Sequence, residues 1–162
     1  MMEYVILSFN DNLRAYYKDD AILCMSEDGA APADMALVPQ AKKCAVCTQN
    51  QWGSLITPNG KRAKACSEFA WLSLLAPDDT SKYQMRVSST SLRALRDYEK
   101  SLKDRGCNVK DVVTKVITET TNTHDLLSFR VVRFLDDGEL ENLIQLSNVR
   151  APMFEPVDGY TH

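Results

Sequence analysis

The chain has 162 residues, of which 44% are hydrophobic and 25% are charged, a composition that fits one globular domain with a buried core. It contains no apolar run of about 18 residues, and its first residues carry no basic segment, so we expect a cytoplasmic protein with neither a membrane-spanning helix nor a secretory signal. The net charge of −3, taken alone, argues against nucleic acid as a partner.

The charge is distributed unevenly along the chain. Residues 1–36 hold two basic and seven acidic residues, and residues 116–162 hold three basic and eight acidic residues. Residues 37–76, by contrast, hold five basic residues and one acidic residue, and residues 82–115 hold nine basic and four acidic residues. Because salt screens charges over only about 8–10 Å, a local basic surface can act on a protein that is acidic overall. The alternative is that these basic side chains merely solvate the surface.

The first half of the chain predicts strands on either side of a long loop. Residues 3–9 predict a strand, and residues 10–36 predict a polar, irregular segment. Residues 39–67 form a loop that contains three of the five cysteines. Residues 68–76 are strongly apolar and predict a buried strand, with a short helix as the alternative.

The second half predicts a helix between strands. Residues 82–88 alternate in polarity and predict a strand, after which residues 89–91 offer N-caps and Gly106 stands at the C-terminal end of a helix. The apolar stripe of this helix consists of Leu92, Leu95, Tyr98 and Leu102. Residues 109–119 and 126–134 are rich in β-branched residues and predict a hairpin around a polar turn.

Residues 137–147 predict a short acidic helix, and residues 151–162 predict a flexible C-terminal tail. Several short strands with one or two helices indicate a mainly β fold of the α+β class. The order of the elements matches a five-stranded Greek-key barrel of the OB type. We therefore predict one OB-like domain over residues 1–150, with a loop inserted at residues 24–66.

Four cysteines carry the clearest chemical signal. Cys44 and Cys47 form a C-x2-C motif, a spacing that presents two thiolates to one metal ion. Nineteen residues separate Cys24 from Cys44, and 18 separate Cys47 from Cys66. Zinc binds four such ligands in a tetrahedron, and the thiols of a cytosolic protein stay reduced. We therefore predict one structural Zn²⁺ ion bound by all four cysteines.

Other interpretations of these cysteines are buried free thiols or a redox pair. At the fourth ligand position, His124 or Cys107 could replace Cys24. A site closed by four cysteines leaves no open coordination position, so the metal is expected to fold the loop rather than to catalyse a reaction.

The loop that contains the cysteines is basic. No acidic residue occurs between Cys44 and Cys66, and the turn Pro58-Asn59-Gly60 reverses the chain between them. A loop with only positive charge indicates a phosphate-bearing ligand. The predicted nucleic-acid contacts are Lys42, Lys43, Trp52, Lys61, Arg62, Lys64, Arg86 and Arg93.

The aromatic residues divide into one exposed candidate and a core pair. Trp52 lies among polar residues of the loop, so we expect its ring to be exposed and able to stack on bases. Phe69 and Trp71 share one parity on the predicted strand, where a place in the core is favoured over a stacking platform.

Catalytic motifs are absent from the sequence. The chain has two histidines and none of the signatures of hydrolases, NTPases, metalloproteases or zinc deaminases. The acidic pairs at residues 19–20, 78–79 and 136–137 occur in turn-like contexts, where solvated carboxylates are the usual role. We therefore expect a protein that is not an enzyme.

Several short motifs occur together over residues 24–110. Cys24-Met-Ser-Glu-Asp-Gly29 is followed by Pro32, and Cys44-Ala-Val-Cys47 is followed by polar residues and Gly53-Ser54. Gly60-Lys-Arg-Ala-Lys-Ala-Cys66 closes the loop, and Val87-Ser-Ser-Thr-Ser-Leu92 leads into the helix. In these motifs the chain resembles a family of small zinc-containing proteins of tailed phages and prophages that bind single-stranded DNA. That family commonly has proline after the second cysteine of the C-x2-C motif, where this chain has Thr48.

The resemblance implies an OB-like core with a zinc insertion, and a role in phage DNA replication or recombination in the cytoplasm of the bacterial host. We therefore predict a single-stranded-DNA-binding protein of low sequence specificity. Its acidic segments, such as residues 136–141, are expected to recruit phage or host replication and recombination proteins. The alternative is a phage protein-binding module, in which the same zinc-stabilised fold inhibits or recruits a host polymerase, nuclease or defence complex.

Overall fold

The structure is a computed structural model that describes residues 2–77, 81–122 and 124–147. The predicted tail, residues 151–162, lies outside these ranges. No helix in the described ranges is both long and apolar enough to cross a membrane.

The chain divides into two compact units. We call Met1–Phe9 together with Trp71–His162 the sheet unit, and Asn10–Ala70 the cysteine unit. Residues 24–66, which the sequence predicts as an inserted loop, all belong to the cysteine unit.

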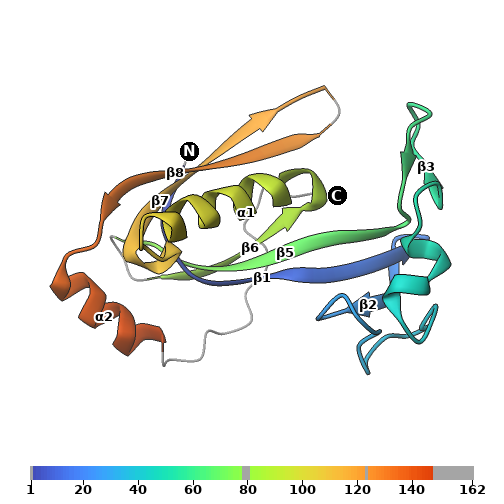
Figure 1. Ribbon diagram of the computed structural model, residues 1–162, viewed down its shortest axis with the longest axis horizontal. Helices are drawn as coiled ribbons and strands as arrows, with labels where there is room; N and C mark the ends of the chain where they lie inside the picture. Colours follow the sequence, from blue (N-terminus) through green and yellow to red (C-terminus); the bar gives the residue numbers. More distant parts are fainter. Residues whose placement is uncertain (1, 78–80, 123, 148–162) are drawn as a thin grey trace. The chain divides into compact units, whose positions relative to one another are not determined.

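Six described strands form one open antiparallel sheet in the order β6-β5-β1-β7-β8, with β2 paired to β1 (Figure 1). Their bounds are β1 Met2–Lys18, β2 Ala21–Ser26, β5 Cys66–Leu75, β6 Lys82–Ser88, β7 Val112–Thr120 and β8 Asp125–Phe134. A separate two-stranded sheet consists of β3 Leu55–Ile56 and β4 Arg62–Ala63. The helices are α1 Ser89–Asp104 and α2 Asp137–Ser147, with 3₁₀ turns η1 Cys44–Val46, η2 Thr48–Asn50 and η3 Val109–Asp111.

The mainly β, α+β class predicted from the sequence is confirmed. The described strands do not close into a five-stranded barrel, because the sheet has six strands and ends at β6 on one side and β8 on the other. The apolar face that closure of a barrel would bury is covered by α1 instead. A helix laid on an open sheet satisfies the same requirement for burial as a closed barrel.

The prediction of an irregular segment at residues 10–36 is wrong for its first half. β1 continues to Lys18, and β2 returns beside it. The reversal takes place at Asp19 and Asp20, whose φ angles of 52° and 64° lie in the left-handed region. Aspartate tolerates this region better than most residues, and two such residues in succession match a two-residue hairpin turn.

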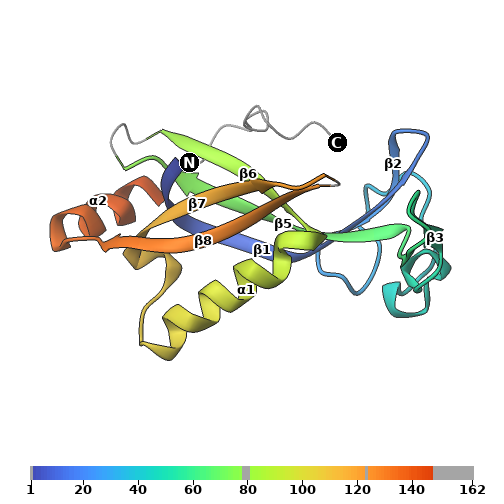
Figure 2. The same ribbon diagram turned by 90° about the horizontal axis from the view of Figure 1, so that it is seen from above.

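α1 lies lengthwise against one face of the sheet (Figure 2). Its predicted stripe of Leu92, Leu95, Tyr98 and Leu102 is buried. The Tyr98 hydroxyl forms a buried hydrogen bond of 2.7 Å with the Thr114 hydroxyl, and the Tyr98 ring stacks on Phe129 with 6.0 Å between centroids. Thr114 of β7 and Phe129 of β8 therefore point toward α1.

The opposite face of the sheet holds a second core cluster. It is formed by Val5, Leu75, Val113 and Leu143, the last of which belongs to α2. The helix predicted at residues 137–147 is therefore present, but its apolar side is only partly buried, since Ile144 is 64% exposed.

β8 is an edge strand and contains one extra residue. Val113 of β7 pairs with Arg133, whereas the next residue, Thr114, pairs with Val131. Val132 therefore has no counterpart on β7 and forms a bulge. Such a bulge bends its strand and increases its twist.

We expect Tyr98→Phe to lower the free energy of unfolding by about 1–3 kcal/mol, because it removes the partner of the fully buried Thr114 hydroxyl. Adding Thr114→Val should recover most of that loss, since no buried polar group is then left unsatisfied. Urea denaturation followed by circular dichroism measures both effects, with the exposed Val132→Ala as a control that changes stability by less than about 0.5 kcal/mol. A double variant less stable than Tyr98→Phe contradicts this account.

Candidate metal centre and basic loop

The C-x2-C motif forms a tight 3₁₀ turn. Cys44 begins η1, and the Cys47 amide donates a hydrogen bond to the Cys44 carbonyl at 3.2 Å. The Cys44 amide in turn donates to the Ala30 carbonyl at 2.8 Å, which ties the turn to the segment after β2. The two cysteines are 9% and 8% exposed, so both are buried.

All four predicted ligands line one cavity within the cysteine unit. Cys24 comes from β2, Cys66 begins β5, and the C-x2-C turn contributes the other two. The cavity measures about 20 Å³, which is room for one water-sized body. We call it the cysteine cavity. The alternative ligands Cys107 and His124 belong to the sheet unit and do not line it.

The four thiols are close together without forming a coordination sphere. In the described part of the chain, no three Cys, His, Asp or Glu side chains are arranged as a metal site. Burial raises the pKa of the Cys66 thiol, and the Arg14 guanidinium opposes that rise. The other three cysteines of the cavity raise the pKa of Cys66 as well.

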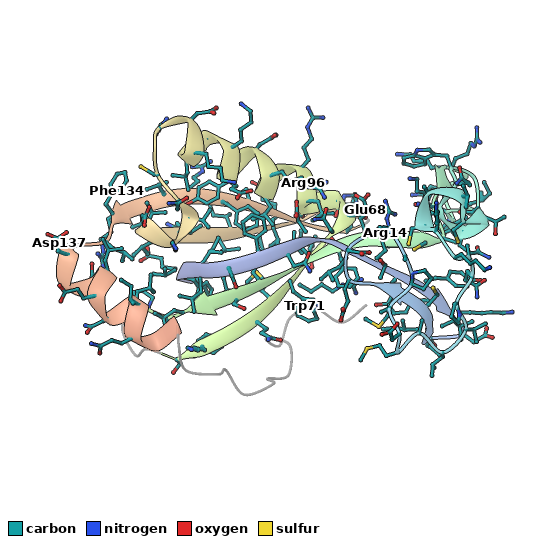
Figure 3. All side chains as sticks on the ribbon, turned by 60° about the horizontal axis from the view of Figure 1, so that its bottom comes forward. Arg14, Glu68, Trp71, Arg96, Phe134 and Asp137 are labelled. Carbon is teal, nitrogen blue, oxygen red and sulfur yellow. The ribbon has the colours of Figure 1, made fainter. Side chains whose placement is uncertain are left out.

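A polar network adjoins the cysteine cavity. Arg14 of β1 forms an ion pair with Glu68 of β5 (Figure 3). Its other terminal nitrogen donates to the Asn50 side-chain oxygen at 2.7 Å. Asn50 also donates to the Cys44 carbonyl at 2.8 Å, and its side-chain oxygen accepts from Lys64 at 3.3 Å. Asn50 thus connects the C-x2-C turn to two cationic side chains.

The sequence analysis did not identify Arg14, Asn50 or Glu68 as site residues. Thirty-six positions separate Arg14 from Asn50, and 54 separate it from Glu68. Their proximity follows from the pairing of long strands, and none of the three belongs to a short motif that could have revealed it.

Trp52 is 67% exposed, as predicted for a stacking platform, and it lies beside two cationic side chains. The Lys64 ammonium stands 5.5 Å from the centroid of the indole, which is a cation–π geometry. The Arg62 guanidinium donates to the Trp52 carbonyl at 3.1 Å. It also covers Gly53, where φ is +91° and a Cβ would stand 3.1 Å from the guanidinium, so a larger residue is strained there.

The other predicted loop contacts lie nearby in the same unit. Lys42 and Lys43 are exposed and directly precede the C-x2-C turn. Lys61 is exposed beside the predicted turn at Pro58–Gly60, where Gly60 has a φ angle of +76°. Six of the eight predicted nucleic-acid contacts thus belong to the cysteine unit.

Arg86 and Arg93 belong to the sheet unit, on its two opposite sides. Tyr83 of β6 contacts Tyr4 on the α1 face, with 5.9 Å between ring centroids. Because side chains alternate along a strand, Arg86 points to the other face. Arg93 projects from α1 and is 94% exposed, with Asp97 at 3.8 Å. The structure therefore does not bring these two arginines together.

Comparison with protein-family models, with curated proteins and with solved structures finds no match for this chain. The interpretation of the site therefore depends on its own geometry and on the motifs of the sequence.

We expect Asn50→Ala to loosen the C-x2-C turn, because it removes the hydrogen bond to the Cys44 carbonyl and the shared contact with Arg14 and Lys64. A loss of about 1.4 kcal/mol in local stability corresponds to about tenfold faster alkylation of Cys44 and Cys47. Mass spectrometry of the chelator-treated protein measures this, with Cys107 of the sheet unit as an internal reference. Unchanged labelling rates at both cysteines contradict a structural role for Asn50.

Proposed function

We propose that this protein binds single-stranded DNA with little sequence preference and acts in phage DNA replication or recombination. The observation that carries the proposal is the exposed Trp52 ring with Lys64 and Arg62 beside it. An exposed aromatic ring flanked by cations can stack on a base while the cations neutralise the adjoining phosphates. Lys42, Lys43 and Lys61 extend the positive charge of the same unit.

We further propose that one structural Zn²⁺ ion, bound by Cys24, Cys44, Cys47 and Cys66, stabilises the cysteine unit. The convergence of these residues on the cysteine cavity supports this assignment. Each cysteine side chain has three staggered rotamers, so its sulfur can shift toward an ion while the backbone keeps its place. Four thiolates would close the coordination sphere and make the metal structural, which supports our proposal of a binding protein rather than an enzyme.

Closure of the sheet is not required for this mode of binding. In OB folds, single strands lie along a basic groove and stack on aromatic side chains of the strands. The same chemistry is available on an open sheet, and an OB-like arrangement of the strands remains part of the proposal. The resemblance in residues 24–110 supports a phage protein that works in the cytoplasm of a bacterial host.

Partner proteins of replication or recombination are proposed to bind the acidic segment at residues 136–141. This segment includes the first turn of α2, where Asp137 and Glu139 lie. Acidic side chains on the surface are suited to contacts with basic partner surfaces.

The second candidate function is a protein-binding module directed at a host polymerase, nuclease or defence complex. It is favoured by the exposed apolar side chains of the cysteine unit, among them Met35, Leu37 and Val46 at 68%, 76% and 73% exposure. Where exposed apolar side chains gather into one patch, they mark a protein interface. Capture of a host protein that survives nuclease treatment supports this function, whereas capture that depends on nucleic acid supports the first.

We expect the purified protein to contain one zinc ion per chain and Cys44→Ser to lose it, while Cys107→Ser keeps it. Removal of zinc by a chelator should lower the melting temperature, because metal binding contributes to the folding free energy. Zinc affinity should also fall as the pH falls, since the metal must displace thiol protons and the pKa of Cys66 is raised. Mass spectrometry and calorimetry test this. A zinc-free protein whose melting temperature is unaffected by chelation contradicts the proposal.

We expect oligo-dT to quench the emission of Trp52 in a Trp71→Phe variant, in which Trp52 is the sole tryptophan. Lys43→Gln with Lys61→Gln should reduce the slope of log affinity against log salt by about 1.4, at about 0.7 per phosphate contact. The matched control is Lys100→Gln with Lys103→Gln, an equal change of charge on α1. Absence of binding by the unmodified protein at about 10 µM and low salt contradicts the proposal.

A further inference from the structure

A largely buried arginine lies at the cysteine cavity. Among the described residues that line this cavity, Arg14 is the only one with a permanently charged side chain. That side chain is only 12% exposed. A charge buried to this degree is costly unless it meets opposite charge or hydrogen-bond acceptors. The surroundings of Arg14 therefore indicate what its charge serves.

Strand register places Arg14 on the same side as two of the predicted metal ligands. Tyr16 of β1 pairs with Cys24 of β2, and Arg14 shares the parity of Tyr16, so Arg14 and Cys24 lie on one face. On β5, Cys66 shares the parity of Glu68, which forms the ion pair with Arg14. Cys66 therefore points to the side on which the guanidinium lies. This agrees with the lining of the cavity, to which all three residues contribute.

Two acceptors hold this guanidinium in place. One terminal nitrogen forms the ion pair with Glu68, and the other donates to the Asn50 side-chain oxygen at 2.7 Å. Asn50 in turn donates to the Cys44 carbonyl at 2.8 Å, which fixes the guanidinium relative to the C-x2-C turn. Lys64, the other cation of this network, stands over the Trp52 ring and does not line the cavity.

The ion pair with Glu68 does not cancel the charge that Arg14 presents to the cavity. The Glu68 side chain is 40% exposed, so water screens its charge more strongly than that of the arginine. Glu68 is also not part of the cavity lining. In keeping with this, the guanidinium lowers the pKa of the Cys66 thiol, against the effect of burial.

We propose that Arg14 is a positioning residue of the metal centre, where it compensates the negative charge of the cysteine thiolates; this inference rests on the zinc site of the proposed function. Four thiolates around one Zn²⁺ ion leave an excess of negative charge, which is costly to bury. A guanidinium fixed beside the ligands lowers that cost. Outer partners of this kind typically contribute about 10–100-fold to metal affinity.

The experiment measures metal affinity by titration with Co²⁺, whose absorption bands report tetrahedral coordination and thiolate ligands, and with Zn²⁺ in competition with a chromogenic chelator. Arg14→Gln should weaken the binding of both ions by about 10–100-fold. Arg14→Lys keeps the charge and should recover most of that loss. The matched control is Lys18→Gln, which removes an exposed positive charge from the same strand and should leave the affinity unchanged.

Glu68→Gln separates charge compensation from a merely structural role. It breaks the same ion pair as Arg14→Gln, but it removes a negative charge from the neighbourhood of the thiolates instead of a positive one. We therefore expect Glu68→Gln to bind the metal at least as tightly as the unmodified protein. If Arg14 serves only to connect β1 to β5, both variants lose affinity alike, and the proposal is wrong. Should Arg14→Gln fail to fold, weakened metal binding by Glu68→Gln alone overturns the proposal.

Failure of this inference can be told apart from failure of the zinc site. If the unmodified protein binds neither Co²⁺ nor Zn²⁺, the zinc site and the role of Arg14 are both wrong. If the unmodified protein binds these ions and Arg14→Gln binds them as tightly, with the same absorption spectrum, only the role of Arg14 is wrong. If Arg14→Lys loses as much affinity as Arg14→Gln, compensation of charge is likewise wrong and the zinc site stands.

Discussion

Few large apolar side chains are buried in the described cysteine unit, and this constraint governs the rest of the site. It spans about 60 residues, a length at which the burial of apolar surface gives only marginal stability. Several of its large apolar side chains are exposed, including Leu37, Val46 and Trp52. A polar network also joins its elements: Arg14 links β1 to Glu68 of β5, and Asn50 links that pair to the C-x2-C turn. A metal ion in the cysteine cavity would add the cross-link that a small core cannot provide.

The two tryptophans differ in exposure because one lies in a loop and the other in a strand of the sheet. Trp52 stands in a short loop with cations within reach of its ring and its carbonyl, and it is largely exposed. Trp71 belongs to a regular strand, where alternation decides which side it faces. Its sequence neighbour at the same parity, Phe69, is 5% exposed, whereas Trp71 is half-buried. A residue of the same parity on the same strand can therefore be core at one position and surface at another.

Local features of the sequence predicted much of the fold. The stripe of α1 and the glycine beyond its end, the β7–β8 hairpin and the C-x2-C turn all depend on contacts within a few residues, and each is present. The β1–β2 hairpin was missed because its turn consists of two aspartates rather than the usual glycine or asparagine. The Arg14–Asn50–Glu68 network and the side of the sheet on which Arg86 lies both follow from strand register, which a single sequence does not display.

The bulge in β8 affects whether this edge of the sheet can pair with an extended strand of another molecule. A straight, flat edge strand offers unpaired amides and carbonyls to any other extended chain, and it is a common starting point for aggregation. In β8 the bulge at Val132 interrupts that row, and Arg130 places an exposed positive charge beside it, whereas Arg133 is paired with Glu139 of α2. Electrostatic repulsion and the local bend both disfavour stacking of one molecule onto the next. The bulge thus makes this edge of the sheet a poor template for pairing with a second extended chain.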